Sequence, residues 1–265
     1  MQHPFNSIQS LHLSEAYVCI QGEGPLAGIP HILIRTNGCP MRCQFKGSFC
    51  DTPFTSWNLE KEKDKNWAEE LCKLYENNPQ ITHTMISGGE PTANQNLLNS
   101  LTHEIWQRYS HKITIETAGY GFIPFVPNMV MSLSPKLHNS YPVVGSQTPW
   151  GTIVTEKDRL RHIKNSDQLS VVVSNLRVLG EQGSYYIKYV VGDMIDLVSL
   201  EDWVEKISTL YNFNIPPSKI YLMPSGIDDA DLAKKRKQIA NYCISKGYNY
   251  SDRLHIIIYG NERGV

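Results

Sequence analysis

The most informative stretch of the sequence runs from Gly38 to Thr52 and reads GCPMRCQFKGSFCDT. It places three cysteines, Cys39, Cys43 and Cys50, in one short segment, with gaps of three and six residues between them. The stretch follows an apolar run that is typical of a buried strand, so the thiols should lie in a loop at the carboxyl end of that strand. Several thiolates in one loop suit a soft metal ion or an iron–sulfur cluster.

The cysteine spacing alone leaves three interpretations open. A structural zinc site would need a fourth ligand, and no second cysteine pair lies nearby, while His31 and His83 are isolated. Three thiolates without a fourth match an iron–sulfur cluster whose remaining iron is open to a ligand. A zinc ion completed by a distant histidine, or three incidental thiols, would give the same spacing. The pattern favours the cluster without excluding the other two.

Length and composition describe an ordinary folded chain without a strong global charge. The 265 residues are 41% hydrophobic and 19% charged, with a formal net charge of −1, which excludes a disordered chain and gives no basic field for nucleic acid. No apolar run reaches the roughly 18 residues that span a bilayer, and we expect no signal peptide. Six cysteines in such a chain indicate metal binding or chemistry rather than disulfides, and we expect a cytoplasmic protein.

Alternating strand-like and helix-like segments predict an α/β fold in a single domain over residues 1–265. The expected strands are His31–Thr36, Thr84–Ser87, Lys112–Thr117, Met129–Leu133, Tyr185–Val191, Lys219–Met223 and Leu254–Tyr259. The expected helices are Trp67–Tyr75, Leu97–Tyr109, Asp202–Tyr211 and Asp228–Lys246. Right-handed crossovers would give a mostly parallel sheet, either open or closed into a barrel. The segment Asn139–Asp158, with its prolines and glycines, is expected to be a loop over the site.

Two motifs resemble those of radical S-adenosylmethionine enzymes. The cysteine loop resembles their Cys-x3-Cys-x2-Cys loop, with a second gap four residues longer, and we expect Lys46–Ser48 to bulge outward so that the thiols still converge. The sequence SGGEP at Ser87–Pro91 follows an expected strand. It resembles the Gly-Gly-Glu-Pro motif that holds the methionyl amino group of the cofactor. Glycines let a backbone approach a ligand closely, and an acid or a carbonyl can accept from an ammonium group.

Further motifs, in order along nearly the whole chain, resemble the 7-carboxy-7-deazaguanine synthase family. They are QGEG at Gln21–Gly24, Arg35, CDT at Cys50–Thr52, ETAG at Glu116–Gly119, SPK at Ser134–Lys136 and the C-terminal residues Leu254–Val265. Each motif is weak alone, and the ordered set is specific. The resemblance implies a partial, TIM-like β/α barrel of the radical S-adenosylmethionine type. It would have about six or seven mostly parallel strands, with the cluster loop within residues 37–52.

The resemblance also implies an activity and its cofactors. The enzyme would be a lyase that converts 6-carboxy-5,6,7,8-tetrahydropterin to 7-carboxy-7-deazaguanine with loss of ammonia, for queuosine or another deazapurine. A deoxyadenosyl radical would abstract hydrogen from C6, and the ring would then contract. The cofactors would be a [4Fe–4S] cluster, S-adenosyl-L-methionine and Mg²⁺, and the electron donor a flavodoxin- or ferredoxin-type protein. A homodimer is expected, with no direct contact to nucleic acid or membrane.

Residue roles follow from the motifs that match the family. Cys39, Cys43 and Cys50 would hold the cluster, and Thr52 would coordinate Mg²⁺, a hard ion that takes oxygen ligands. The expected substrate contacts are Ile20, Gln21, Gly22, Glu23, Arg35, Ser87, Glu116, His255 and Val265. The expected cofactor contacts are Phe49, Cys50, Asp51, Gly89, Glu90, Ser134, Pro135, Lys136, Met223, Pro224, Ser225 and Gly226. The MPSG sequence at Met223–Gly226 replaces a Gln-Pro element of many family members, which leaves the adenine contact open.

Several of these residues also have ordinary structural interpretations. Arg35 suits a bidentate grip on the substrate carboxylate, but a strand arginine can instead pair with a structural acid. Glu23 could be a surface acid, Thr52 a helix cap, and His255 a histidine satisfied within an apolar strand. The remaining cysteines are expected to be buried structural thiols: Cys19, Cys72 and Cys243.

Two alternative functions remain at this level. Another small radical S-adenosylmethionine enzyme, such as a glycyl-radical activase, would share the cysteine loop, although QGEG together with SPK would not be expected there. A zinc-binding module without catalysis would share only the clustered thiols.

Overall fold

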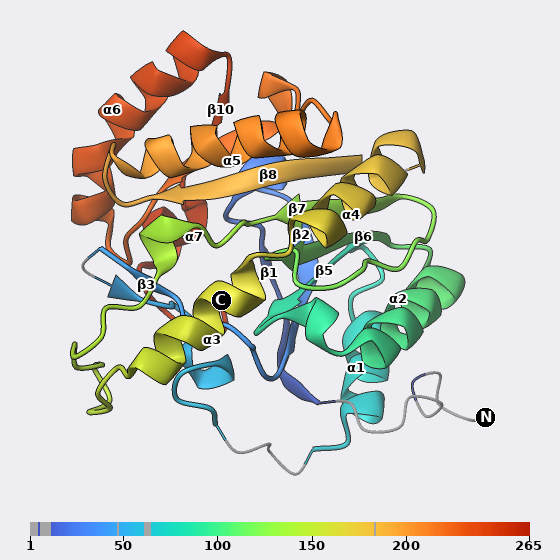
Figure 1. Ribbon diagram of the computed structural model, residues 1–265. Coiled ribbons are helices and arrows are strands. Elements are labelled where there is room, and N and C mark those ends of the chain that lie inside the picture. Colours follow the sequence, from blue (N-terminus) through green and yellow to red (C-terminus); the bar gives the residue numbers. More distant parts are fainter. Residues whose placement is uncertain (1–4, 6–11, 47, 61–64, 183) are drawn as a thin grey trace.

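The computed structural model describes residue 5 and residues 12–46, 48–60, 65–182 and 184–265. In this part of the chain the main sheet has eight strands in the order β1-β2-β5-β6-β7-β8-β9-β10 (Figure 1). The strands from β2 to β10 pair in parallel, and β1 joins the edge antiparallel to β2. Because β1 and β10 lie at opposite edges, the sheet is an open, partial barrel, as expected.

The elements have the following limits. The main-sheet strands are β1 (Leu13–Ile20), β2 (Pro30–Thr36), β5 (His83–Gly88), β6 (Lys112–Thr117), β7 (Met129–Leu133), β8 (Ser184–Val191), β9 (Ile220–Pro224) and β10 (Asn249–Tyr250). A separate hairpin consists of β3 (Gln44–Phe45) and β4 (Ser48–Phe49). The α-helices are α1 (Trp67–Glu76), α2 (Gln95–Tyr109), α3 (Glu156–Ser166), α4 (Leu169–Gln182), α5 (Asp196–Tyr211), α6 (Asp229–Lys246) and α7 (Leu254–Tyr259). None of the described helices has the length and apolar character needed to cross a bilayer.

The expected inner strands are confirmed, two of them, Lys112–Thr117 and Met129–Leu133, with the same limits. The expected strand Leu254–Tyr259 is wrong, because these residues form helix α7. Only Ile256 of its three isoleucines is buried, while Ile257 and Ile258 are about half exposed, so the run lacks the two-sided cover of a parallel strand. The last parallel position belongs to β10, beside β9.

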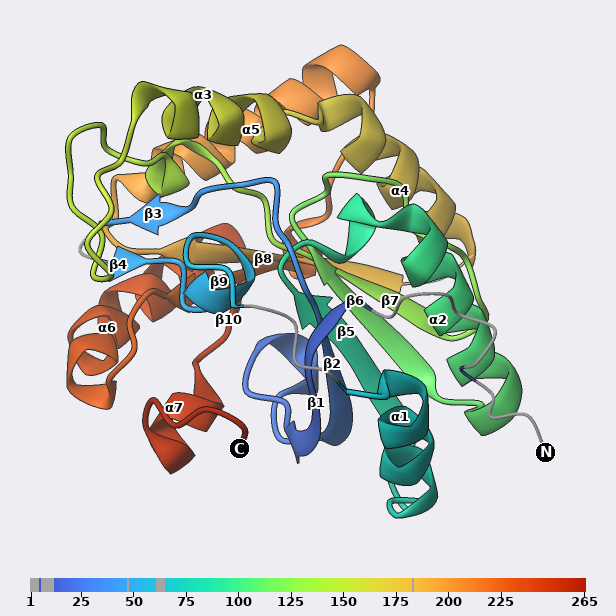
Figure 2. The same cartoon turned by 90° about the horizontal axis from the view of Figure 1, so that it is seen from below.

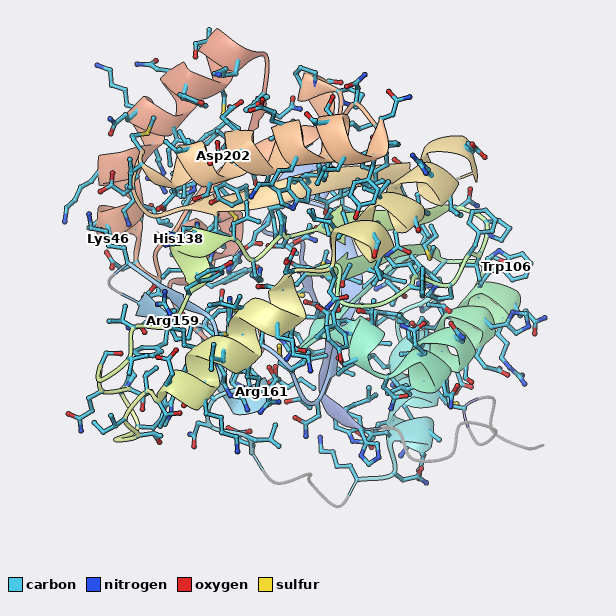
Figure 3. The ribbon with its side chains drawn as sticks, viewed as in Figure 1. Lys46, Trp106, His138, Arg159, Arg161 and Asp202 are labelled. Atoms are coloured by element: carbon cyan, nitrogen blue, oxygen red, sulfur yellow. The ribbon has the colours of Figure 1, made fainter. Side chains whose placement is uncertain are left out.

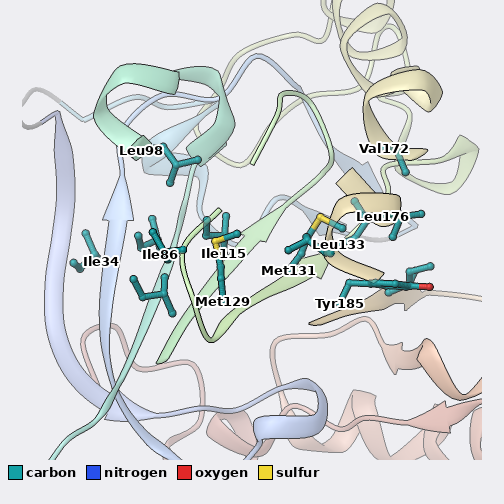
Figure 4. Close-up of a cluster of buried hydrophobic side chains, with 14 of the residues drawn as sticks. Ile34, Ile86, Leu98, Ile115, Met129, Met131, Leu133, Val172, Leu176 and Tyr185 are labelled. Atoms are coloured by element: carbon teal, nitrogen blue, oxygen red, sulfur yellow. The ribbon is translucent and has the colours of Figure 1, made fainter. Parts of the chain in front are cut away.

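Strand β2 shows how the sheet separates the core from a cavity. Ile32 and Ile34 are fully buried and join the hydrophobic core, in which Figure 4 shows Ile34. His31, Leu33 and Arg35 alternate with them and line a cavity on the other face, as the two-residue period of a strand requires. Figure 2 shows helices such as α2 and α4 packed along the outside of the curved sheet. The side chains of β2 that line the cavity therefore lie on the opposite, inner face of the sheet.

Helices α3 and α4 are missing from the sequence prediction. Helix α3 is strongly polar and has no apolar stripe of the kind that marks a helix. Its one signal is the capping box formed by Thr155 and Asp158, a pattern that begins helices. Helix α4 places Val172, Val173 and Leu176 in the core, but consecutive valines are equally typical of a strand. The expected loop from Asn139 is confirmed as far as the start of α3.

Candidate active site

One cavity of about 490 Å³ opens at the carboxyl ends of β2, β5, β6, β8 and β9. Its lining includes the three clustered cysteines and Thr52. It also includes every expected substrate and cofactor residue except Pro135. The structure thus brings residues from Ile20 to Val265 together in one place.

A hairpin takes up the long second gap of the cysteine loop. β3 and β4 pair antiparallel, and the N–H of Cys50 donates to the carbonyl of Cys43 at 3.2 Å. The two cysteines are therefore neighbours at the base of the hairpin, although six residues separate them. The bulge expected at Lys46–Ser48 corresponds to the tip of this hairpin, of which Gly47 lies outside the described residues.

The loop of residues 139–155 covers this hairpin. Gln44 Oε1 accepts a hydrogen bond from the N–H of Val143 at 2.8 Å. The rings of Phe49 and Trp150 meet edge to face, with centroids 5.6 Å apart. The loop therefore shields the cysteine segment from one side.

Helix α3 supports the backbone of the cysteine loop. Arg161 Nε donates to the carbonyl of Pro40 at 2.9 Å, and Asn165 Nδ2 donates to the same oxygen at 3.0 Å. His162 Nδ1 accepts the N–H of Arg42 at 3.1 Å. Helix α3 was not predicted because it is strongly polar. The same polar side chains hold the cysteine loop in place.

The three thiols fit an iron–sulfur cluster better than a single zinc ion. Zinc draws its ligands to within about 2.3 Å, yet among the described residues no three His, Cys, Asp or Glu side chains gather closely enough for one ion. Burial raises the pKa of Cys39 to about 12, so the free thiol stays protonated near neutral pH. A bound metal centre supplies the positive charge that deprotonates such ligands.

The Gly-Gly-Glu-Pro motif joins the cysteine loop to two strands. A Cβ on Gly89 would lie 2.0 Å from the carbonyl oxygen of Gly38, and the N–H of Glu90 donates to that carbonyl at 3.0 Å. The carboxylate of Glu90 is buried and accepts from Thr117 Oγ1 at 2.5 Å and from the N–H of Ala118 at 2.8 Å. The glycine therefore permits a close backbone contact, and the acid ties β5 to the end of β6.

A buried lysine that the sequence analysis missed lies between the two expected substrate acids. Nζ of Lys188 contacts both Glu23 Oε2 and Glu116 Oε1. The side chains of Lys188 and Glu23 are only 5% and 14% exposed, so the surface-acid interpretation of Glu23 is wrong. Ser87 Oγ donates to the second oxygen of Glu116 at 3.2 Å. A lone lysine in an apolar strand gives no sequence signal of such partners.

Arg253, also missed, connects three segments of the site. Its Nε donates to Glu23 Oε1 at 3.0 Å, and its Nη2 donates to Asp51 Oδ2 at 2.7 Å. Nη1 donates to the carbonyl of Gly226. One guanidinium, 8% exposed, thus links the QGEG turn, the cysteine loop and the end of β9. The only sequence signal is its place directly before the last apolar run.

Arg35 lies beside a structural acid and also faces the cavity. Its Nε lies 3.2 Å from Glu15 Oε2, so the alternative of an acidic partner is realised. The pair is not aligned as a hydrogen bond, because both atoms are buried without a hydrogen-bond partner in the described chain. A buried polar group without a partner costs roughly 1–3 kcal/mol. Since Arg35 also lines the cavity, it is suited to an anionic ligand.

Thr52 begins the short turn η3 (Pro53–Thr55) without capping it by a described side-chain hydrogen bond. Its hydroxyl lies 3.4 Å from Cys50 Sγ and belongs to the cavity lining. Thr52 therefore occupies the cap position of this turn, as the alternative interpretation expected, but its hydroxyl is turned to the cavity instead of capping the turn.

The remaining thiols divide into two kinds. Cys72 and Cys243 are buried, as expected. Cys19 is only partly buried and lines the cavity, with its Sγ 3.6 Å from His31 Nε2, so its assignment as a buried structural thiol is wrong. His255 also lines the cavity, from helix α7 rather than from an apolar strand.

Two strand ends complete the cavity on the expected cofactor side. The N–H of Ser134 donates to the carbonyl of Thr117 at 2.7 Å, and Lys136 Nζ donates to Ser134 Oγ at 2.7 Å. At the end of β9, Met223 and Gly226 line the wall.

Gly22 should tolerate no side chain. A Cβ there would lie 1.8 Å from Nδ1 of His255, and the Gly22 carbonyl accepts the N–H of Leu254 at 2.8 Å, so the two segments are held together. We expect Gly22→Ala to lower the free energy of unfolding by about 1–3 kcal/mol, measured by urea denaturation. Gly180→Ala in α4, where the nearest atom is 3.8 Å away, is the control and should be neutral or stabilising. Equal losses in both variants would contradict this packing.

Comparisons with known proteins identify the family of the chain. A family model described as a 4Fe-4S single cluster domain matches residues 20–138. A 7-carboxy-7-deazaguanine synthase from Rhodopirellula baltica is 32% identical over 260 residues, covering 98% of this chain and 90% of that protein. The synthase from Halobacterium salinarum is 29% identical, covering 95% of this chain and 91% of that protein. The crystal structure of QueE from Escherichia coli has a TM-score of 0.57 and 22% identity over 92% of this chain and 93% of that one, and it shares the fold.

The matched cluster-domain model includes both the cysteine loop and the Gly-Gly-Glu-Pro motif. Together with the convergence of Cys39, Cys43 and Cys50 on one cavity, this supports a [4Fe–4S] cluster with S-adenosylmethionine as its cofactor. The sequence identity extends over nearly the whole length of both proteins. This chain therefore belongs to the 7-carboxy-7-deazaguanine synthase family.

Proposed function

We propose that this chain is a radical S-adenosylmethionine lyase that converts 6-carboxy-5,6,7,8-tetrahydropterin to 7-carboxy-7-deazaguanine with loss of ammonia. The observation that carries the proposal is the shared cavity, which is lined by the cysteine loop, Arg35, Glu23 and Glu116. A redox cofactor, an anionic group and a hydrogen-bond-donating ring edge would each meet complementary groups there. The product would enter queuosine or another deazapurine.

Cys39, Cys43 and Cys50 would hold the cluster, with one iron open to S-adenosylmethionine. When bound, the cluster supplies the electron for reductive cleavage of that cofactor. The chain itself would bind the cluster and shield it from solvent. Met41 and Ala118 are buried against Cys43, which keeps water away from the thiols. Burial of this kind prevents side reactions of reactive species.

Three charged side chains match the two ends of the pterin. An ionised carboxylate only accepts hydrogen bonds, so Glu23 and Glu116 suit the N–H groups of the aminopyrimidinone edge. Arg35 suits the 6-carboxylate, because a guanidinium can donate two parallel hydrogen bonds to it. Gln21 shapes the turn, since its Oε1 accepts the N–H of Glu23 at 3.2 Å. Fixing both ends would orient C6 toward the cofactor.

We propose Thr52 as the protein ligand of a Mg²⁺ ion beside the substrate. Mg²⁺ prefers oxygen ligands and usually keeps several waters. One hydroxyl, substrate oxygens and water would therefore complete its shell.

We propose that the electron donor is an acidic protein of the flavodoxin or ferredoxin type. Figure 3 shows Arg159 and Arg161 on α3 and Lys46 at the hairpin, on the face formed by these two elements. Arg161 contacts the backbone of the cysteine loop directly. Complementary charge there would steer such a donor to the cluster.

Three further expectations complete the proposal. The chain would act as one domain, supported by the continuous main sheet of the described residues. It would form a homodimer, which sedimentation equilibrium tests. It would work in the reducing cytoplasm, where thiols stay free to bind iron.

Turnover tests the function. Iron-loaded protein is incubated anaerobically with the tetrahydropterin, S-adenosylmethionine, Mg²⁺ and a reductant, and products are identified by mass spectrometry. We expect 7-carboxy-7-deazaguanine and ammonia, both dependent on each component. If 5′-deoxyadenosine forms without the deazaguanine, the chain is another small radical enzyme. If the protein binds zinc without sulfide, the assignment of an iron–sulfur cluster is wrong.

A further inference from the structure

Lys188 is the one charged residue of strand β8, which reads SYYIKYVV. Its neighbours Ile187 and Tyr189 point into the hydrophobic core, so the strand alternation turns Lys188 into the cavity. There its ammonium contacts one oxygen of Glu23 and one of Glu116. Both carboxylates touch the same nitrogen, so they lie within about 6 Å of each other, twice the length of a hydrogen bond.

Charged and titratable groups from every adjoining element face or flank this triad. They are His31 and Arg35 from β2, Asp51 from the cysteine loop, Tyr186 from β8, and Arg253 and His255 at the start of α7. Of the basic groups, Arg253 pairs with Glu23. In the described part of the chain, Glu116 has an ion pair with Lys188 alone.

Electrostatics favour a cation beside each of two neighbouring carboxylates, and Lys188 is the cation paired with Glu116. Two carboxylates this close cannot both ionise without a cation, and one of them takes up a proton instead. Burial raises the pKa of Glu23, but the charges of Lys188 and Arg253 outweigh it and hold that pKa well below its usual range. Burial lowers the pKa of Lys188, and the two carboxylates outweigh this and raise it. Glu23 and Lys188 therefore stay charged near neutral pH.

We propose that Lys188 is a positioning residue that keeps Glu23 and Glu116 both ionised, so that together they accept the N–H donors of the pterin ring. This inference rests on the proposed function, because the donors belong to that substrate. A protonated carboxyl offers an O–H donor, which would face a ring N–H and weaken binding. Lys188 thus sets the preference for a donor-rich ring edge without contacting the reacting carbon.

The Lys188→Met variant removes the charge and keeps the length of the side chain. The two acids should then share a proton near neutral pH, and this proton must leave before the pterin binds. Affinity should therefore rise with pH, by up to about tenfold per pH unit, starting from a Kd weaker than that of wild type at pH 6.5. Wild type and Lys188→Arg should show little pH dependence. Lys188→Met/Glu116→Gln should bind weakly at every pH, because it has no second carboxylate to titrate.

The test uses iron-loaded protein with S-adenosylmethionine and no reductant, so that nothing turns over. Calorimetry gives the Kd of the tetrahydropterin from pH 6 to 9, and infrared difference spectra detect a protonated carboxyl without substrate. Lys73→Met, at an exposed pair on α1, is the control and should behave as wild type. A protonated carboxyl and a pH-dependent Kd in Lys188→Met support the proposal. An equal loss at all pH values, or no protonated carboxyl, overturns it and leaves a purely structural lysine. If wild type binds no tetrahydropterin, the proposed function fails and the substrate part of this inference fails with it, while the infrared signal still decides the charge-balancing part.

Discussion

The Cys50→Ala variant should lose the cluster and all turnover while it keeps its fold. Three thiolates are needed to leave a single iron open, and the β3–β4 hairpin places Cys50 beside Cys43 through one backbone hydrogen bond of 3.2 Å. That bond does not involve the side chain, so the hairpin should survive the substitution. We expect iron and sulfide to fall from four per chain to near zero, and activity to fall by at least about a thousandfold.

A thiol outside the cavity provides the control. Cys72 lies in α1, 1% exposed, in the hydrophobic core. Cys72→Ala should keep the full iron and sulfide content and lose roughly 1 kcal/mol of stability. Iron and sulfide analysis with circular dichroism measures both variants. Full cluster content in Cys50→Ala would show that another residue is the third ligand.

The Arg253→Met variant should lose both stability and catalysis. Removing the guanidinium leaves Glu23 with Lys188 as its remaining close cation and frees Asp51 from its hydrogen bond at 2.7 Å. Breaking a buried ion pair from one side costs about 3–5 kcal/mol. Since the QGEG turn and the cysteine loop lose their link, a displacement of about 1 Å would reduce kcat/KM by about a hundredfold.

The matched control is Arg108→Met on α2. Arg108 pairs with Glu104 at 2.8 Å across one helical turn, with its side chain 49% exposed. Exposed pairs of this kind contribute less than about 1 kcal/mol, so stability and kcat/KM should stay close to wild type. Denaturant unfolding and steady-state kinetics measure both effects. If Arg253→Met behaves like this control, Arg253 does not link the three segments.

The inner strands of the main sheet could be predicted from the sequence because they are covered on both faces. The apolar run Lys112–Thr117 has its observed limits, since helices and cavity wall enclose it. The run Leu254–Tyr259 reads LHIIIY and is more apolar, but only one of its isoleucines is buried. Pattern alone does not distinguish an apolar strand from a short helix that covers a cavity.

The cationic half of the site could not be predicted from motifs. Lys188 and Arg253 form their ion pairs with Glu23 across 165 and 230 residues of sequence, and no local spacing records such contacts. The acids were found because they belong to short motifs. Helix α3 was not predicted for a related reason. Its side chains make polar contacts to the cysteine loop, and such contacts leave no apolar pattern in the sequence.

In the proposed reaction, one cavity brings the cofactor and the pterin into contact. Deuterium placed on C6 of the tetrahydropterin tests this most directly, with mass spectrometry of S-adenosylmethionine and 5′-deoxyadenosine recovered after turnover. We expect deuterium in the recovered S-adenosylmethionine and 5′-deoxyadenosine. Its amount should rise with the amount of 7-carboxy-7-deazaguanine formed. Formation of the deazaguanine with unlabelled nucleosides would contradict the proposed reaction.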